Sequence, residues 1–367
     1  MQLKYCIIER ISSIILREQY RRDHMETNIN YTLKVLEEIV NIPSPTGYCR
    51  NVMNQIEKIA EENGCKVTQN KKGNRIIEIE GTDNSRCIGI PVHVDTLGAM
   101  VRSINSDGTL KISSIGGNMF STLDGEYCKI HTRSGKIYTG TLLSTSPAVH
   151  VFTDARSKER NEENMMVRLD EIVKCKEDVQ ALEIGAGDFI SIEPKFIVTS
   201  SGFIKSRYLD DKAGTACALS LIEMFNRLKT KPKINVKIII SSYEEVGHGC
   251  SSIPDDIDEL VAIDMGCIGL DLSCTEQDVS ICAKDGSGPY DYDITGKLIE
   301  LSKKYNLNYA VDIYPMYSSD VSASLKGGND IRGGLIGPGV HASHGMERTH
   351  VDGLENTIKL MYAYLTE

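Results

Sequence analysis

The sequence predicts an α/β fold that is interrupted by a small all-β insertion. Three observations lead to this prediction. Apolar residues recur at helical spacing near both ends of the chain, and almost continuous apolar runs of strand length lie between them. Such runs are typical of parallel strands whose two faces are both covered by helices. Residues 98–197, in contrast, carry short strand-like pieces separated by Gly, Ser and Asp turns.

The individual elements follow from local patterns. Apolar side chains repeat every three or four residues in five predicted helices, at residues 30–40, 51–62, 212–228, 291–305 and 353–365. Apolar runs predict the strands of the α/β part at residues 65–67, 75–79, 87–92, 236–241 and 260–263. In the insertion, strands are predicted at residues 109–112, 127–131, 137–142 and 189–192, with a helical patch at 170–173.

These patterns divide the chain into four segments. Residues 25–97 and 198–367 form the two parts of one α/β domain, and residues 98–197 form the inserted β domain. Residues 1–24 are an N-terminal extension whose apolar pieces are broken by Glu9 and Arg10, which is untypical of a secretory signal. The extension fits either an amphipathic helix or a leader that is not native to the protein.

Composition excludes several classes of protein. A hydrophobic content of 41% with 25% charged residues excludes global disorder, and a formal net charge of −10 without a Lys/Arg cluster argues against nucleic-acid partners. No stretch approaches the roughly 18 consecutive apolar residues of a membrane span, so no membrane association is expected. The 11 cysteines are odd in number and include no CxxC pair, which favours reduced thiols and a cytoplasmic location.

Polar clusters lie just beyond predicted strand ends and helix starts. Each cluster alone has an ordinary structural explanation, such as a capped turn, a helix N-cap or a solvated face. Together they indicate chemistry, because carboxylates that leave buried strands need a compensating cation. The clusters are His93-Val94-Asp95, Asp210-Asp211, Glu244-Glu245, Asp264 and His341-Ala342-Ser343-His344.

Two imidazoles with three or four carboxylates form a mixed nitrogen and oxygen ligand set. This set suits zinc, cobalt or manganese better than calcium or an iron–sulfur cluster, and it does not choose among the three. There are more ligands than one tetrahedral ion requires, so a bridged pair of ions about 3.5 to 4 Å apart is consistent with the set. One carboxylate would then be left to act as a base.

The ordered motifs resemble the signature of the dinuclear zinc exopeptidases: HVD at 93, LDDKAG at 209, YEEVG at 243, AIDMG at 262 and ASHGME at 342. The insertion, with SSIGGN at 113 and IGAGDFISIEP at 184, resembles the small β domain of the tetrahedral (TET-type) and glutamyl aminopeptidases. The resemblance implies a phosphorylase/hydrolase-like three-layer αβα catalytic domain and a PDZ-like β-barrel used for dimerisation. It also implies a homo-oligomer, from a dimer to a tetrahedral dodecamer.

The same resemblance implies ligands for two divalent ions per chain, with zinc as the first candidate. His93 and Asp264 would hold one ion, Glu245 and His344 would hold the other, and Asp210 would bridge both. Members of the family hold the peptide bond after the bridging Asp in the cis form. His341 competes with His344 as a ligand, and His344 is preferred because the following Gly-Met-Glu resembles the family pattern.

Three further carboxylates have implied roles. Glu244 would be the general base that takes a proton from the attacking water. Asp95 would accept the second N–H of the His93 imidazole and fix its orientation. Asp320, in Ser318-Ser319-Asp320, would hold the free α-ammonium group of the substrate, although an Asp that makes only local hydrogen bonds in a Ser-rich turn is equally consistent.

The function implied by the resemblance is that of a metal-dependent aminopeptidase acting on peptides with a free N-terminus. Two alternatives stay open from the sequence alone. One is a related dinuclear metallo-deacylase or carboxypeptidase of the same clan, and the other is a non-catalytic binding protein on this fold. The sequence does not reveal the preferred N-terminal residue.

Overall fold

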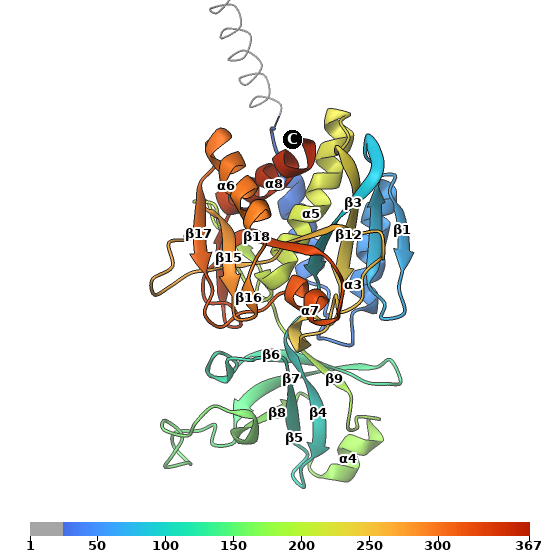
Figure 1. Cartoon of the computed structure of the whole chain (residues 1–367). Helices are drawn as coiled ribbons and strands as arrows, with labels where there is room; N and C mark the ends of the chain where they lie inside the picture. The colour runs from blue at the N-terminus through green and yellow to red at the C-terminus, as the bar shows by residue number, and fades with distance from the viewer. Residues whose placement is uncertain (1–24) are drawn as a thin grey trace, which may run out of the picture.

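The computed structural model describes residues 25–367, which form an α/β unit and a β-barrel below it in Figure 1. The predicted α/β fold with an inserted barrel is confirmed. The extension predicted for residues 1–24 lies outside the described residues. Among the residues that are described, no helix combines the length and the apolar character that crossing a membrane requires.

A ten-stranded mixed sheet forms the centre of the α/β unit, and its four middle strands, β12, β3, β13 and β18, are parallel. Their carboxyl ends therefore meet at one edge of the sheet. In spatial order the path is β1 (Lys66–Gln69), β2 (Arg75–Ile79), β12 (Ile234–Ser241), β3 (Asp83–His93), β13 (Glu259–Ile263), β18 (Arg332–Val340), β15 (Val279–Asp285) and β16 (Gly288–Pro289). Two more strands join β18 and β15, namely β14 (Gly266–Cys267) and β17 (Tyr309–Ile313).

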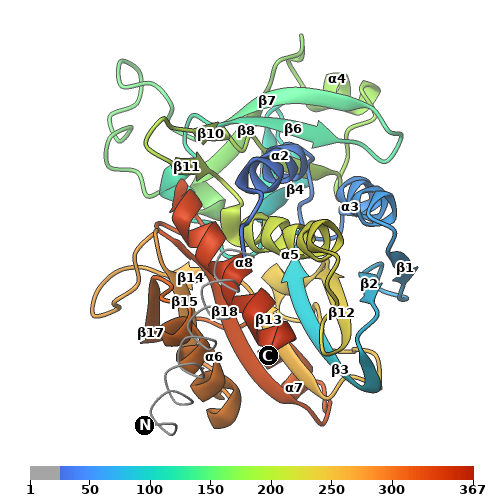
Figure 2. The same ribbon diagram turned by 90° about the horizontal axis from the view of Figure 1, so that it is seen from above.

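Five helices bury their apolar sides in one hydrophobic core with the sheet. Figure 2 shows α2, α5 and α8 side by side, and α5 is the central one because it packs against both of the others. A buried hydrogen bond of 2.8 Å between Thr32 and Ser220 ties α2 to α5. The helices are α2 (Ile29–Val40), α3 (Arg50–Glu62), α5 (Leu209–Leu228), α6 (Tyr292–Lys304) and α8 (Val351–Thr366).

The opposite face of the sheet is covered more thinly. Its core contains Cys250, Ile253 and Ile257 from the loop after β12, together with Val321 of the short helix α7 (Asp320–Lys326). The five helices, the sheet and this covering are the three layers of the α/β unit.

The inserted unit is a closed six-stranded antiparallel barrel in the order β4-β5-β8-β7-β6-β9. Its hydrophobic core is separate from that of the sheet and includes Leu110, Ile130 and Leu142. The prediction of a helical patch at residues 170–173 is wrong. The helix α4 begins later, at Lys176, where a capping box between Cys175 and Asp178 fixes its first turn. The barrel elements are β4 (Gly98–Ile104), β5 (Leu110–Ile115), β6 (Tyr127–His131), β7 (Ile137–Ser144), β8 (Met165–Leu169), α4 (Lys176–Ala181) and β9 (Phe189–Ile192).

A small three-stranded sheet connects the barrel exit to the end of the chain. β10 (Ile197–Val198) pairs with β11 (Phe203–Ser206), and β11 pairs with β19 (Glu347–His350). This pairing fixes the loop between β18 and β19 close to the start of α5. Both segments carry residues of the predicted site.

The sequence patterns do not predict β18, although it lies in the middle of the sheet. Its sequence, RGGLIGPGV, has few of the β-branched residues that favour strands. The glycines are explained by close packing: a Cβ at Gly334 would lie 2.6 Å from the Ile294 side chain, and one at Gly337 would overlap the backbone of Asp264.

Candidate active site

The predicted site residues meet at the carboxyl edge of the parallel strands. His93 is the last residue of β3, and Asp264 directly follows β13. Glu244 and Glu245 lie in the single turn η3 (Glu244–Val246) after β12. The strand β18 leads into the loop that carries His344, and Asp210 stands at the start of α5.

Asp210 lies between the two imidazoles. Its Oδ1 is 3.1 Å from Nε2 of His93, and its Oδ2 is 3.5 Å from Nε2 of His344. Each carboxylate oxygen thus faces a different histidine, which is the arrangement that a bridging ligand requires. The Asp210–Asp211 peptide bond is cis.

Three more carboxylates surround the same two nitrogens. Nε2 of His93 is 3.7 Å from Oε2 of Glu244 and 4.0 Å from Oδ1 of Asp264. Nε2 of His344 is 3.5 Å from Oε2 of Glu245. Two groups within this cluster have ligand atoms close enough to share an ion, namely His93 with Asp210 and Glu245, and His93 with Asp211 and Asp264.

Both imidazoles are held in the same way. Nδ1 of His93 donates to the main-chain carbonyl of Asp95 at 3.1 Å, and Nδ1 of His344 donates to that of Gly117 at 2.9 Å. Since a carbonyl only accepts, Nδ1 carries the hydrogen in each ring. Each Nε2 therefore faces carboxylates with its lone pair unless a proton or a metal ion lies between them. This is the usual setting of metal-binding histidines.

The electrostatics indicate a missing positive charge. Burial raises the pKa of Asp264 to about 7 and raises the pKa values of Glu244 and Glu245 well above their ordinary range. The hydrogen-bonding contact with Asp210 raises the pKa of His344 to about 10. The pKa of His93 is also raised, because the neighbouring carboxylates outweigh its burial. A divalent cation would supply the charge that these protons now supply, so the residues fit a metal site.

Asp95 acts differently from the prediction. The His93 imidazole donates to its main-chain carbonyl, while its carboxylate Oδ1 stays 3.7 Å from Nδ1. The buried carboxylate instead accepts hydrogen bonds from the Thr46 hydroxyl (2.7 Å) and from the backbone N–H groups of Glu244 (3.2 Å) and Glu245 (3.3 Å). Asp95 therefore fixes the backbone of the glutamate pair. The expected side-chain bond to His93 is corrected to a main-chain bond.

Sequence reasoning gave no role to Glu347, which the structure places under the cluster. Its buried carboxylate accepts the backbone N–H of Asp210 at 3.1 Å and that of His344 at 3.0 Å. It therefore positions Asp210 and His344 together. The only sequence signal was its spacing of three residues after His344.

Two predicted or competing residues lie elsewhere. The Asp320 carboxylate is buried at the start of α7, where Oδ1 accepts the backbone N–H of Cys250 at 2.7 Å, and it does not line the cavity of the site. The structure therefore does not bring Asp320 to a position where it would meet a substrate ammonium group. His341 is exposed and makes a backbone bridge to Arg348, away from the cluster.

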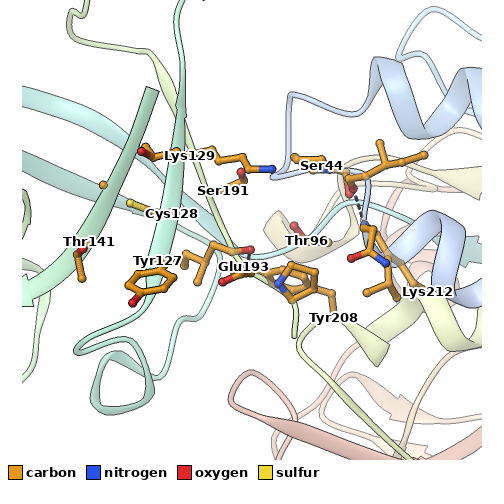
Figure 3. A pocket seen from close by; sticks show the side chains of 18 of the residues that line it. Ser44, Thr96, Tyr127, Cys128, Lys129, Thr141, Ser191, Glu193, Tyr208 and Lys212 are labelled. Carbon is orange, nitrogen blue, oxygen red and sulfur yellow. Dashed lines mark hydrogen bonds between the residues drawn. The ribbon is translucent and has the colours of Figure 1, made fainter. Parts of the chain in front are cut away.

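A cavity of about 410 Å³ opens over the cluster and is lined by Asp210, Glu244, Glu245, Asp264 and His344. A larger cavity of about 570 Å³ lies between the barrel and the α/β unit (Figure 3), and none of the proposed metal ligands lines it. Its inner end holds Lys212, whose ammonium group donates to the Ile42 carbonyl at 2.9 Å and whose pKa is lowered to about 7 by burial. The chemistry therefore belongs to the smaller cavity.

One buried and one partly exposed imidazole lie among carboxylates at the carboxyl edge of an α/β sheet and beside a cavity, which is the arrangement of a metal-dependent hydrolase. The M42 glutamyl aminopeptidase family matches residues 73–360. The chain is 48% identical over 340 residues to YhfE of Bacillus subtilis (strain 168), named as an aminopeptidase, with 92% of this chain and 98% of that protein covered. The chain therefore belongs to the M42 family and is a metal-dependent aminopeptidase.

Two more distant comparisons agree with this assignment. The lysyl aminopeptidase of Pyrococcus furiosus is 24% identical, with 91% of this chain and 96% of that protein covered. The fold matches the Pyrococcus horikoshii TET1 peptidase with a TM-score of 0.80 at 21% identity, over 92% of this chain and 99% of that one. That peptidase is described as assembling into a tetrahedron or a large octahedral shell.

Proposed function

We propose that the aminopeptidase uses two divalent metal ions per chain, with Asp210 as the bridging ligand. His93 and Asp264 would hold one ion, and Glu245 and His344 the other. The observation that carries this proposal is that Asp210 faces Nε2 of one histidine with each of its oxygens, while both rings donate through Nδ1 to main-chain carbonyls. The ligand set accepts zinc, cobalt or manganese, and zinc is the first candidate.

Glu244 is the general base in this proposal. Its carboxylate lies 3.7 Å from Nε2 of His93 and belongs to neither of the two groups whose ligand atoms could share an ion, so it is left to accept a proton from the attacking water. It would then pass that proton to the amine nitrogen as the carbon–nitrogen bond breaks. The Asp95 carboxylate keeps this base in place by accepting its backbone N–H. When bound, the ions would polarise the scissile carbonyl and stabilise the negative charge that develops on its oxygen.

The substitution Glu244→Gln tests the base assignment. The amide keeps the shape of the side chain but does not accept the proton, so we expect kcat to fall by about 10²- to 10⁴-fold. The metal content per chain should stay at the wild-type value, because Glu244 is not a proposed ligand. Elemental analysis and steady-state kinetics on the same preparation give both quantities, and a metal-loaded variant with wild-type turnover would refute the assignment.

We also propose that the protein is a cytoplasmic homo-oligomer, from a dimer up to a tetrahedral dodecamer, in which the barrel mediates dimerisation. Several large apolar side chains are exposed on the barrel unit, including Tyr127, Ile137, Val151 and Ile172, which is the surface that a subunit contact would cover. The ten cysteines among residues 25–367 are all unpaired, as in a reducing compartment. Light scattering on the purified protein tests the assembly, and a monomeric mass would refute it.

A further inference from the structure

The cavity over the cluster has a second wall that carries no ligand. Besides the cluster residues, the cavity is lined by Gly247, Met265, Cys267, Met316, Tyr317, Ser318 and Ser343. None of these seven residues is charged. The wall thus differs in character from the carboxylate cluster with which it shares the cavity.

The apolar part of this wall comes from two neighbouring segments. Met265 directly follows Asp264 after β13, and Cys267 is the second residue of β14. Met316 and Tyr317 precede α7. Met265 is buried, and Cys267 is half-buried against the cores on both faces of the sheet. The Tyr317 ring packs edge-on against the ring of Tyr314 at 5.1 Å. Met316 is 92% exposed and forms the outer rim of the wall.

An aminopeptidase must hold the side chain of the first residue beside the bond that it cuts. The cluster residues would be occupied by the reacting groups, so the uncharged lining is the part of the cavity that is left for the first side chain. We propose that this wall is the specificity pocket and that the enzyme removes neutral, apolar residues of medium size, such as Leu and Met, in preference to Glu and Lys. The inference rests on the proposed position of the reaction at the Asp210 cluster.

Charge explains the discrimination. A glutamate or a lysine side chain would meet no residue of opposite charge among the seven residues of this wall. Burial of an unpaired charge is costly, whereas the flexible thioethers of Met265 and Met316 adapt to apolar side chains of different shapes.

The first test is a panel of aminoacyl-p-nitroanilides assayed with the metal-loaded wild-type enzyme. We expect kcat/KM for the Leu and Met substrates to exceed that for the Glu and Lys substrates by about 100-fold, since a site rejects side chains whose charge stays unpaired. Equal or higher kcat/KM for Glu or Lys would overturn the inference. Absence of hydrolysis across the whole panel would overturn the proposed function as well, so the two failures are distinguishable.

A reciprocal pair of substitutions at the rim then tests the position of the pocket. Because Met316 is almost fully exposed, Met316→Lys and Met316→Glu should fold normally. We expect Met316→Lys to raise the Glu/Leu ratio of kcat/KM by about two- to fivefold and Met316→Glu to raise the Lys/Leu ratio by a similar factor, as for exposed ion pairs.

The matched controls are Tyr292→Lys and Tyr292→Glu, because Tyr292 is 89% exposed on α6 and does not line the cavity. These controls should leave both ratios unchanged. If the two Met316 variants shift both ratios in the same direction, or leave them unchanged, the pocket lies elsewhere.

Discussion

Two buried histidines, one in the barrel and one in the sheet, illustrate the difference between the two units. His131 of the barrel bonds to the Ser191 hydroxyl at 2.8 Å, and burial lowers its pKa to about 4. His93 is equally buried, but its pKa is raised because Asp210, Glu244 and Asp264 surround it. Burial alone favours the neutral form of an imidazole, whereas burial among carboxylates favours the positively charged form. The barrel histidine is therefore neutral at pH 7, whereas the sheet edge gathers carboxyl groups that a cation would stabilise.

The two units also differ in what their buried side chains contribute: those of the barrel contribute to stability, and those at the sheet edge contribute to the active site. The barrel has a hydrophobic core of its own, and several of its charges form exposed pairs such as Arg102 with Glu163. The edge of the sheet concentrates buried carboxyl groups that no Lys or Arg compensates directly. We therefore expect substitutions in the barrel core to change stability without changing the metal site, and substitutions at the edge to do the opposite.

The largest effect on stability should come from Ile130→Ala. Ile130 is fully buried in the barrel core, so removal of its side chain should lower the free energy of unfolding by about 2 to 5 kcal/mol. Ile313→Ala is the matched control, because Ile313 is exposed on β17 and its loss should change stability by less than about 0.5 kcal/mol. Denaturant unfolding measures both. A loss of metal from folded Ile130→Ala protein would contradict the separation of the two units.

An intermediate effect is expected at Glu347. Glu347→Gln weakens the acceptor that holds the backbone of Asp210 and His344, so the metal affinity should fall by about 10- to 100-fold. Competition with a chelator measures this affinity. Glu355→Gln on α8, where the carboxylate pairs only with Lys359 at the surface, is the matched control and should bind metal like the wild type.

The smallest effect is a pH dependence of stability in the metal-free protein. The pKa values are raised to about 7 for Asp264, about 8 for Glu347 and about 10 for His344, so the folded state binds more protons than the unfolded state between pH 6.5 and 8. Stability therefore falls as the pH rises through this window. His131 titrates below it and does not contribute.

Thermal unfolding of metal-free and metal-loaded protein at pH 6.5, 7.5 and 8.5 measures this dependence. The melting temperature of the metal-free protein should decrease with pH, and bound metal should largely abolish the decrease, because the cation replaces the protons. A metal-free protein without this pH dependence would argue against uncompensated carboxyl groups at the edge.

The strand ends could be predicted from the sequence because buried parallel strands have a strong local pattern. His93 and Asp264 directly follow apolar runs, and the glutamate pair follows another. The position of His344 could not be predicted this way, because it depends on the strand β18, which has no strand pattern in its sequence. Its glycines are required by close packing against Asp264 and Ile294 instead. The role of Glu347 likewise arises only from the pairing of β11 with β19.

The hydrogen-bond partners of the Asp95 side chain and the burial of Asp320 could not be predicted from local sequence patterns either. Both carboxylates accept backbone N–H groups from the loop after β12, at Glu244 and Cys250. The motifs identify the residue types, and the long-range contacts decide what each carboxylate holds. Family resemblance supplied the ligand pairs that spacing alone left open.

The central claim is that one carboxylate, Asp210, holds two ions. Metal content by elemental analysis of the wild type and of Asp210→Asn tests it most directly, with aminopeptidase activity measured before and after chelation and metal readdition. We predict two divalent ions per wild-type chain, fewer than one in Asp210→Asn, and activity that follows the metal content. One ion in the wild type, or loss of only one of two ions in the variant, would contradict the bridging role.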